Sequence, residues 1–162
     1  MIIHVKNKNT LIIDDFKLKC CIGKKGLNFN KKEGDNSTPK GQFNLNRLYF
    51  RKDRVGLPKC KLRKKEIKKN MAWCDDSKDK RYNEEIKSLS KNNKEKLYRA
   101  DYKYDYVISI SHNYKKIPNK GSAIFIHLTD NYNPTAGCIA LKKKDFEILL
   151  KLINNKTKIK IG

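Results

Sequence analysis

The stretch GSAIFIHLTDNYNPTAGCIAL, residues 121–141, contains a short apolar segment, a polar loop and a second apolar segment. The alternation along AIFIHL predicts a β-strand that places Ile124 and Ile126 on one face and Phe125 and His127 on the other. The histidine stands at the end of this strand, on the face that need not form the deep core. The stretch therefore predicts a strand-loop-strand unit with a histidine where its first strand ends.

A cysteine stands at the far end of the same unit. Cys138 follows NPTAG, in which Pro134 and Gly137 indicate a turn, and a loop of this length can fold back so that the thiol meets the imidazole of His127. A free thiol, with a pKa of about 8.5, is mostly protonated at neutral pH, and an adjacent imidazole can accept that proton. The thiolate would attack a carbonyl carbon, and backbone N–H groups around Gly137 and Cys138 would hold the oxyanion. An inert buried cysteine and a satisfied strand-end histidine are the alternative interpretation.

The length and the charge of the chain limit the number of domains and the kind of partner. A chain of 162 residues suits one domain, residues 1–162, with a sizeable core. The formal net charge of +22 favours polyanionic partners, such as nucleic acid, anionic lipid or an acidic cell-wall polymer. The excess is mostly lysine spread over the whole chain, without an arginine-rich patch or a nucleic-acid-binding motif. We therefore expect no specific nucleic-acid partner.

The cysteine spacing and the hydropathy argue against a zinc-binding protein and against a membrane-spanning helix. The chain has five cysteines and no C-x-x-C pair, so the usual structural zinc spacing is absent and neither a metal nor an organic cofactor is indicated. An odd number of cysteines leaves at least one thiol free. No run of 18 apolar residues predicts a transmembrane helix, and no signal peptide is visible at the N-terminus. We assume a monomer.

Periodicity predicts a mostly β fold. Alternating or β-branched segments predict strands at residues 2–5, 10–13, 16–23, 43–49, 104–112, 121–128 and 157–162. Helical spacing of Phe146, Leu149 and Ile153 predicts one amphipathic helix near the C-terminus. Residues 52–96 are lysine-dense and poorly periodic, which indicates a long irregular insertion with one short helix. An antiparallel pairing of 104–112 with 121–128 puts His112 at the far end of that hairpin from His127.

Two separated motifs together resemble a known family. IFIHL followed by PTAGCIAL resembles the signature of the YkuD-type L,D-transpeptidases, in which a strand-end histidine precedes a Ser/Thr-x-Gly-Cys element. STPKGQF, residues 37–43, resembles the Thr-Pro-x-Gly-x-Phe segment of the same family. The stretches AWCDD, LYRADYKYDYVI and GSAIFIH are similar to those of a compact proteobacterial branch, so the resemblance spans about residues 23–150.

This resemblance implies a fold and a set of roles. It implies a β-sandwich with the site in a cleft beside one sheet. Matched residue by residue, Cys138 is the nucleophile, His127 is the base, and Thr135 and Gly137 shape the nucleophile loop.

The chain departs from the family pattern at two positions. Many members carry a second histidine just before Gly-Cys, where this chain has Ala136. Many carry arginine or asparagine two residues after the cysteine, where this chain has Ala140. With no rival histidine adjacent, the base assignment falls on His127. The group that orients its ring is either a backbone carbonyl or a side chain.

Other residues are candidates for the cleft. Tyr104 and Tyr106 lie on the hairpin strand opposite His127, where a tyrosine either lines the cleft or packs in the sheet. Arg99 either clamps a substrate carboxylate or is a solvated surface residue. Cys74 has two neighbouring carboxylates that would raise its pKa, so we expect a structural role for it.

The resemblance implies a cysteine acyl-transferase that acts on peptidoglycan stem peptides. Attack on the L-centre carbonyl of the diamino acid would release D-alanine and leave a thioester, which an acceptor amine resolves as a cross-link. The alternatives are an L,D-carboxypeptidase, in which water resolves the thioester, and a basic binding module with a degenerate site. Family chemistry places the protein in the cell envelope or periplasm, whereas the sequence at face value would be cytoplasmic.

Overall fold

The computed structural model describes residues 1–87 and 94–162. Its first strands are β1 (Ile2–Lys6), β2 (Thr10–Ile13), β3 (Phe16–Lys19), β4 (Leu27–Asn28), β5 (Thr38–Pro39) and β6 (Gly41–Phe50). The helix α1 (Lys52–Val55) follows, and then β7 (Lys64–Glu66), β8 (Met71–Cys74), β9 (Glu85–Lys87) and β10 (Lys94–Lys96). The last elements are β11 (Tyr106–Ile110), β12 (Phe125–Leu128), β13 (Ile139–Leu141), α2 (Lys143–Leu152) and β14 (Lys158–Ile161). With 39% strand and 9% helix, the fold is mostly β, as the sequence predicts.

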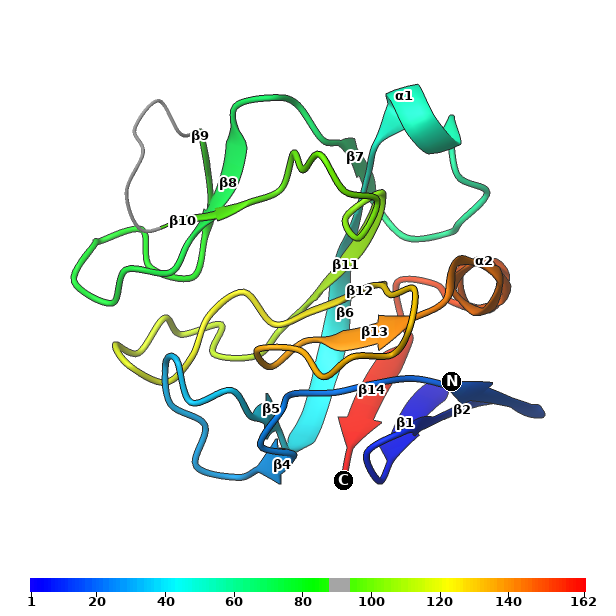
Figure 1. Cartoon of the computed structure of the whole chain (residues 1–162), viewed down its shortest axis with the longest axis horizontal. Helices are drawn as coiled ribbons and strands as arrows, with labels where there is room; N and C mark the ends of the chain where they lie inside the picture. Colours follow the sequence, from blue (N-terminus) through cyan, green and yellow to red (C-terminus); the bar gives the residue numbers. More distant parts are fainter. Residues whose placement is uncertain (88–93) are drawn as a thin grey trace.

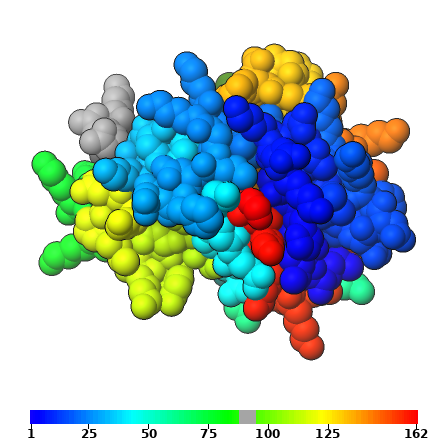
Figure 2. All heavy atoms as spheres, turned by 90° about the horizontal axis from the view of Figure 1, so that it is seen from below, coloured from blue at the N-terminus to red at the C-terminus, as the bar shows by residue number. Residues whose placement is uncertain are grey.

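One sheet organises the molecule (Figure 1). Its strand order is β13-β12-β11-β6-β14-β1-β2-β3, and β7 pairs with the long central strand β6. This sheet curves until it is nearly closed. Smaller sheets are formed by β10-β8-β9 and by β4-β5. Seen from below, β14 lies beside the N-terminal strands at the surface, next to the segment of residues 24–40 (Figure 2).

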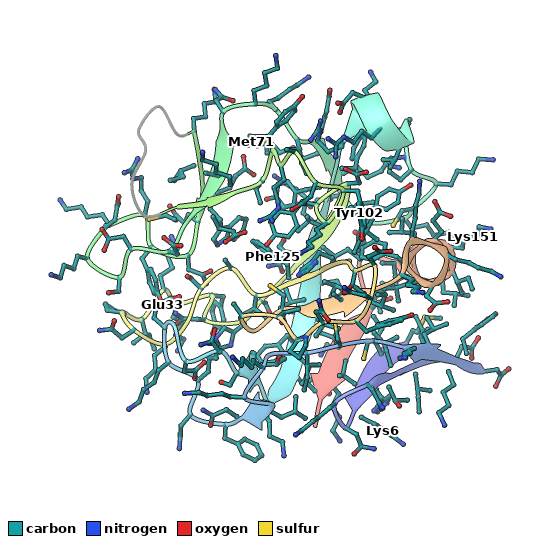
Figure 3. The ribbon with its side chains drawn as sticks, in the orientation of Figure 1. Lys6, Glu33, Met71, Tyr102, Phe125 and Lys151 are labelled. Carbon is teal, nitrogen blue, oxygen red and sulfur yellow. The ribbon has the colours of Figure 1, made fainter. Side chains whose placement is uncertain are left out.

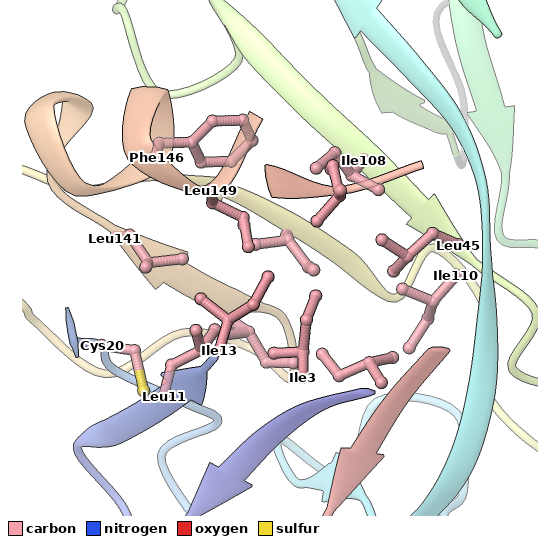
Figure 4. Packing of buried hydrophobic residues seen from close by; sticks show 14 of the residues in the cluster. Ile3, Leu11, Ile13, Cys20, Leu45, Ile108, Ile110, Leu141, Phe146 and Leu149 are labelled. Carbon is pink, nitrogen blue, oxygen red and sulfur yellow. The ribbon is translucent and has the colours of Figure 1, made fainter. Parts of the chain in front are cut away.

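The main hydrophobic core lies inside the curved sheet, with α2 packed over it (Figure 4). Ile108 of β11 pairs with Ile126 of β12, and both side chains point into this core because directly paired residues share one face of the sheet. From α2, the buried Phe146 stacks its ring on that of Tyr106, with 5.5 Å between ring centroids and 8° between ring planes. The predicted amphipathic helix is therefore confirmed, and its apolar face covers the sheet.

The opposite face of β11 and β12 carries a second hydrophobic cluster. Val107 and Phe125 point into it from these strands, and Met71 of β8 faces them from the insertion (Figure 3). The molecule is thus layered, as expected of the β-sandwich fold. His127 belongs to this face because it follows Phe125 by two residues.

The hairpin register agrees with the predicted pairing. Val107 pairs with His127 and Ser109 pairs with Phe125, so the hairpin leaves His112 near its turn and His127 at its open end. This register fixes which side chains of β12 face each cluster, because a shift by one residue would exchange the two faces.

The insertion at 52–96 is more regular than the sequence indicates. It contains the expected short helix, α1, but AWCDD begins as strand β8, which pairs with β9 and β10 on its two sides. Strands this short leave too few residues for a period of two to be recognised, and the flanking lysines obscure it further. Part of the insertion, residues 88–93, lies outside the described residues.

We predict that Phe146→Ala lowers the free energy of unfolding by about 3–5 kcal/mol, because it removes a fully buried ring and leaves a cavity against Tyr106. Urea denaturation measures this change. Lys144→Ala on the exposed face of the same helix is the matched control and should change the value by less than about 0.5 kcal/mol. Equal effects of the two substitutions would contradict the packing described for α2.

Candidate active site

Parallel pairing of β12 with β13 brings the candidate cysteine beside the candidate histidine. Ile126 pairs with Ile139 and His127 pairs with Ala140. Continuing this register by one residue sets Cys138 next to Phe125. Because side chains alternate along a strand, Cys138 and His127 then face the same side of the sheet.

Both side chains line one cleft of about 450 Å³. Its floor is formed by the ends of β12 and β13, and the nucleophile loop, residues 133–138, forms one wall. The segment 31–36 contributes a second wall, and Asp75 and Glu95 come from the insertion. Segments from four parts of the sequence therefore enclose the thiol and the imidazole.

The thiol of Cys138 is held by backbone groups. Its Sγ donates to the carbonyl oxygen of Ala123 at 3.2 Å and accepts from the amide of Phe125 at 3.4 Å. Ala123 has a φ of +51°, a left-handed conformation that is unfavourable for a residue with a Cβ atom. Burial raises the pKa of the Cys138 thiol to about 12, so the resting nucleophile is a protonated thiol.

The imidazole of His127 is oriented by the backbone. Its Nδ1 lies 2.9 Å from the carbonyl oxygen of Leu128, which can only accept, so Nδ1 carries the proton and Nε2 is left with its lone pair. Burial lowers the pKa of His127 to about 4, and the nearby charges of Arg99 and Lys103 act in the same direction. Of the two orienting groups that the sequence left open, the structure has the backbone carbonyl.

Thiol and imidazole are therefore both neutral at pH 7. Within residues 1–87 and 94–162, no hydrogen bond joins Cys138 to His127, since the thiol proton is directed to Ala123. A neutral imidazole with a free Nε2 can accept a proton when the sulfur attacks a carbonyl carbon. The arrangement suits general-base activation rather than a preformed thiolate-imidazolium pair.

Thr135 closes the nucleophile loop on itself. Its Oγ1 donates to the carbonyl oxygen of Cys138 at 2.6 Å and accepts from the amide of Gly137 at 3.1 Å. Its backbone is also fixed, because Thr135 N donates to the carbonyl of Ile22 and Lys24 N donates to the carbonyl of Thr135, both at 2.9 Å. The amide of Cys138 has no acceptor in the described part of the chain, which leaves an N–H group beside the thiol.

Thr38 fixes the same loop from outside. The side chain is fully buried, and its Oγ1 accepts from the amide of Gly23 and donates to the carbonyl of Gly137, each at 2.8 Å. Gly137 has a φ of +144°, and a Cβ atom there would lie 2.8 Å from the carbonyl oxygen of Ser37. Only glycine permits this close approach, so the Thr-Pro segment and the Gly-Cys turn are packed together.

A sequence model of the L,D-transpeptidase catalytic domain, YkuD, matches residues 2–161. The chain belongs to the YkuD family. No curated protein matches it. YkuD domains act on peptidoglycan and are typical of the cell envelope. In the described ranges, no helix is long and apolar enough to cross a membrane.

The YkuD cleft contains one of the two predicted tyrosines. Tyr104 lines the cleft, and its ring lies 5.1 Å from that of His127. The placement of Tyr106 in the cleft is wrong, because its ring is buried in the main core against Phe146. The two tyrosines do not share a face because Tyr104 lies in the turn that precedes β11, where the alternation of a strand does not apply.

Arg99 lies at the cleft but already has partners. Its guanidinium donates to the carboxylate of Asp101, with the shortest contact at 2.7 Å, and lies 3.5 Å from Glu95. It also covers the ring of Tyr104, at 4.9 Å from the centroid. Arg99 therefore packs against Tyr104 and supports this wall of the cleft.

Sequence reasoning missed a buried cation in the YkuD cleft. Lys31 is 5% exposed, lines the cleft, and pairs with Asp35 four residues later. Burial opposes ionisation of Asp35, but hydrogen bonds from Lys31, Lys32 and Ser37 outweigh it and hold the pKa of this carboxyl below its usual range. Among 39 basic residues, no local feature distinguishes Lys31, because its burial depends on contacts distant in sequence.

The other thiols lie outside the cleft. The cysteines are all unpaired. Cys74 is fully buried, and burial together with the charges of Asp79 and Asp75 raises its pKa, which agrees with the structural role expected for it. Burial raises the pKa of Cys20 to about 12, and the adjacent Cys21 adds to this effect. In the described part of the chain, no group of three or more His, Cys, Asp or Glu side chains is arranged to hold a metal ion.

We predict that Thr38→Val lowers the free energy of unfolding by about 1–3 kcal/mol, because valine keeps the shape of the side chain but leaves the buried amide of Gly23 without an acceptor. Chemical denaturation measures the change. Thr10→Val, at a partly exposed position on β2, is the control and should have little effect. A Thr38→Val protein as stable as this control would contradict the bridging role of the hydroxyl.

Proposed function

We propose that the chain is a cysteine acyl-transferase that acts on peptidoglycan stem peptides, with Cys138 as nucleophile and His127 as general base. One observation carries the proposal: in a YkuD chain, the only thiol that lines the cleft in the described residues shares it with an imidazole whose Nδ1 is anchored and whose Nε2 is free. Residues 1–162 act as one catalytic domain in this proposal, and we propose the cell envelope, which is typical of YkuD domains, as its location.

The first half-reaction forms a thioester. As Sγ of Cys138 attacks the L-centre carbonyl carbon of the diamino acid, Nε2 of His127 takes the thiol proton. The amide of Cys138 donates to the oxyanion of the tetrahedral intermediate. When the intermediate collapses, the protonated imidazole gives its proton to the leaving amine, and D-alanine departs.

The second half-reaction resolves the thioester. The amine of an acceptor stem attacks the acyl carbon, His127 accepts a proton from that amine, and the proton returns to the sulfur of Cys138 as the thiolate leaves. The product is a cross-link between two stems. Water in place of the amine would give an L,D-carboxypeptidase from the same acyl-enzyme, so both reactions share one site.

The cleft supplies further candidate substrate contacts. Tyr104 forms a wall against His127, and Thr135 and Gly137 hold the nucleophile loop in place. In this proposal Arg99 contacts a substrate carboxylate only by exchanging it for Asp101, the carboxylate that it binds now. None of these steps requires a metal or an organic cofactor.

The surface charge fits a carboxylate-rich polymer. Exposed lysines occupy outward positions on β1, β3 and β14: Lys6, Lys17, Lys19, Lys158 and Lys160. Together with the net charge of +22, they attract an anionic wall polymer through a long-range effect that salt screens. We propose peptidoglycan as the partner and expect no specific nucleic acid.

We predict that incubation with a carbapenem, which acylates an activated thiol, adds one acyl group to the protein, as measured by intact mass. Cys138→Ala should remove the adduct, because the attacking sulfur is lost. Cys21→Ala, which alters a buried thiol outside the cleft, should leave the adduct in place. An adduct that persists in Cys138→Ala, or none in the wild type, would favour a basic binding module with a degenerate site.

The substrate itself distinguishes the two enzymatic outcomes. A tetrapeptide stem that ends in the diamino acid and D-alanine should release D-alanine in the presence of the protein. A cross-linked dimer identifies transpeptidation, whereas a tripeptide as the sole product identifies carboxypeptidation. Cys138→Ala should produce neither.

We predict that the rate of carbapenem acylation rises with pH through about 4 and is then flat through neutrality. Below the lowered pKa of His127, about 4, the imidazole is protonated and cannot accept the thiol proton; above it, the base is available. Stopped-flow or quenched mass spectrometry from about pH 3.5 to 9 measures the profile. A half-maximal rate near pH 6.5, the ordinary value for histidine, would contradict the buried neutral imidazole.

A further inference from the structure

The side chain of Lys31 passes between Gly121 and Gly137 in the cleft that contains Cys138. A Cβ atom placed on Gly121 would lie 2.9 Å from Cγ of Lys31, and one placed on Gly137 would lie 3.7 Å from its Cε. Both glycines have positive φ angles, +90° and +144°. The side chain therefore runs along glycine backbone and brings its Cε close to Gly137, the residue that precedes Cys138.

The position of the ammonium group is fixed. Nζ donates to the carboxylate of Asp35 and, at 2.8 Å, to the backbone carbonyl of Lys32. Asp35 in turn accepts from the amide and the hydroxyl of Ser37, at 2.8 and 2.7 Å. An ammonium group has three hydrogens, and in the described ranges the third has no acceptor. A buried cation with a spare donor thus lines the cleft.

Other charged and titratable groups also face this space. Glu95 from β10 opposes ionisation of the thiol, whereas Lys31 favours it. The side chains of Tyr104 and His127, which line the cleft, are neutral at pH 7. Charged side chains from other elements line it too: Glu33, Asp75, Arg99 and Lys103. Of the charged groups with a resolved effect on Cys138, Lys31 alone acts in favour of the anion.

We propose that Lys31 is a positioning residue that stabilises the anionic form of Cys138 during attack. The inference deepens the proposed function and rests on it for the role of Cys138. The sulfur gains negative charge as its proton leaves for His127, and a fixed ammonium group in a buried site lowers the energy of that charge without reorganising. Asp35 determines where the ammonium group stands.

The test is the alkylation of Cys138 by iodoacetamide, followed by peptide mass spectrometry at several pH values between about 7 and 9. Alkylation requires the thiolate but no acyl donor. Lys31→Met removes the charge and the donors, while Lys31→Gln removes the charge but keeps an amide that can donate to Asp35. An opposite charge within about 4–6 Å of a thiol lowers its pKa by about one unit or more. Loss of the Lys31 charge should therefore reduce the thiolate fraction, and both variants should react about tenfold more slowly at each pH.

Lys32→Met is the matched control. It removes the same charge one residue away, from a side chain exposed to solvent, and should react within about twofold of wild type. Near-UV circular dichroism establishes that each variant is folded; if Lys31→Met is not, Lys31→Gln decides. Equal alkylation rates in wild type and folded Lys31→Gln would overturn the proposal. A slower rate in Lys31→Met alone would also overturn it, because it would indicate that Lys31 only anchors Asp35.

The two proposals fail in different ways. If Lys31→Gln slows alkylation but the wild type forms no carbapenem adduct, the proposed function fails while the assignment of Lys31 stands. If the wild type forms the adduct and Lys31→Gln alkylates normally, the assignment of Lys31 is wrong and the proposed function stands.

Discussion

The register between β12 and β13 is the constraint on which the site depends. Alternation along β12 sends Ile126 into the main core and His127 to the opposite face, and parallel pairing with β13 sets Cys138 on that same face. The apolar core thereby fixes the relative position of two polar groups that do not bond to each other. A slip of one residue would bury the imidazole among isoleucines and leave the thiol without a partner.

The nucleophile loop shows how distant motifs cooperate. Thr38 bonds to Gly23 and Gly137, and the glycine at 137 lets the backbone around Ser37 approach it closely. The segment of residues 31–38 contains Lys31, Asp35 and Thr38. This one packed segment therefore positions both the nucleophile loop and the ammonium group of Lys31. Burial keeps the thiol and the imidazole neutral, and it also disfavours the negative charge that Cys138 gains during attack. We propose that the ammonium group of Lys31 offsets part of this cost.

Local periodicity was sufficient to predict most of the strands, the helix α2 and the hairpin register, since each of these patterns lies within a few residues. The pairing of a strand-end histidine with Cys138 followed from the motif that surrounds them. Three features were beyond the sequence for physical reasons. The sheet around β8 consists of very short strands. Tyr106 changes face because the strand begins after Tyr104, and Lys31 packs against Gly121 and Gly137, which are distant in sequence.

The measurement that tests the central claim most directly is nitrogen NMR of the His127 ring, with ¹⁵N-labelled histidine and His127→Gln to assign the signals. Burial keeps this imidazole neutral, and the carbonyl of Leu128 keeps its proton on Nδ1, which leaves Nε2 free in the cleft that also contains the thiol. At pH 7 the spectrum should show one protonated and one unprotonated ring nitrogen, with titration near pH 4. Two protonated nitrogens at pH 7, or the proton on Nε2, would contradict it.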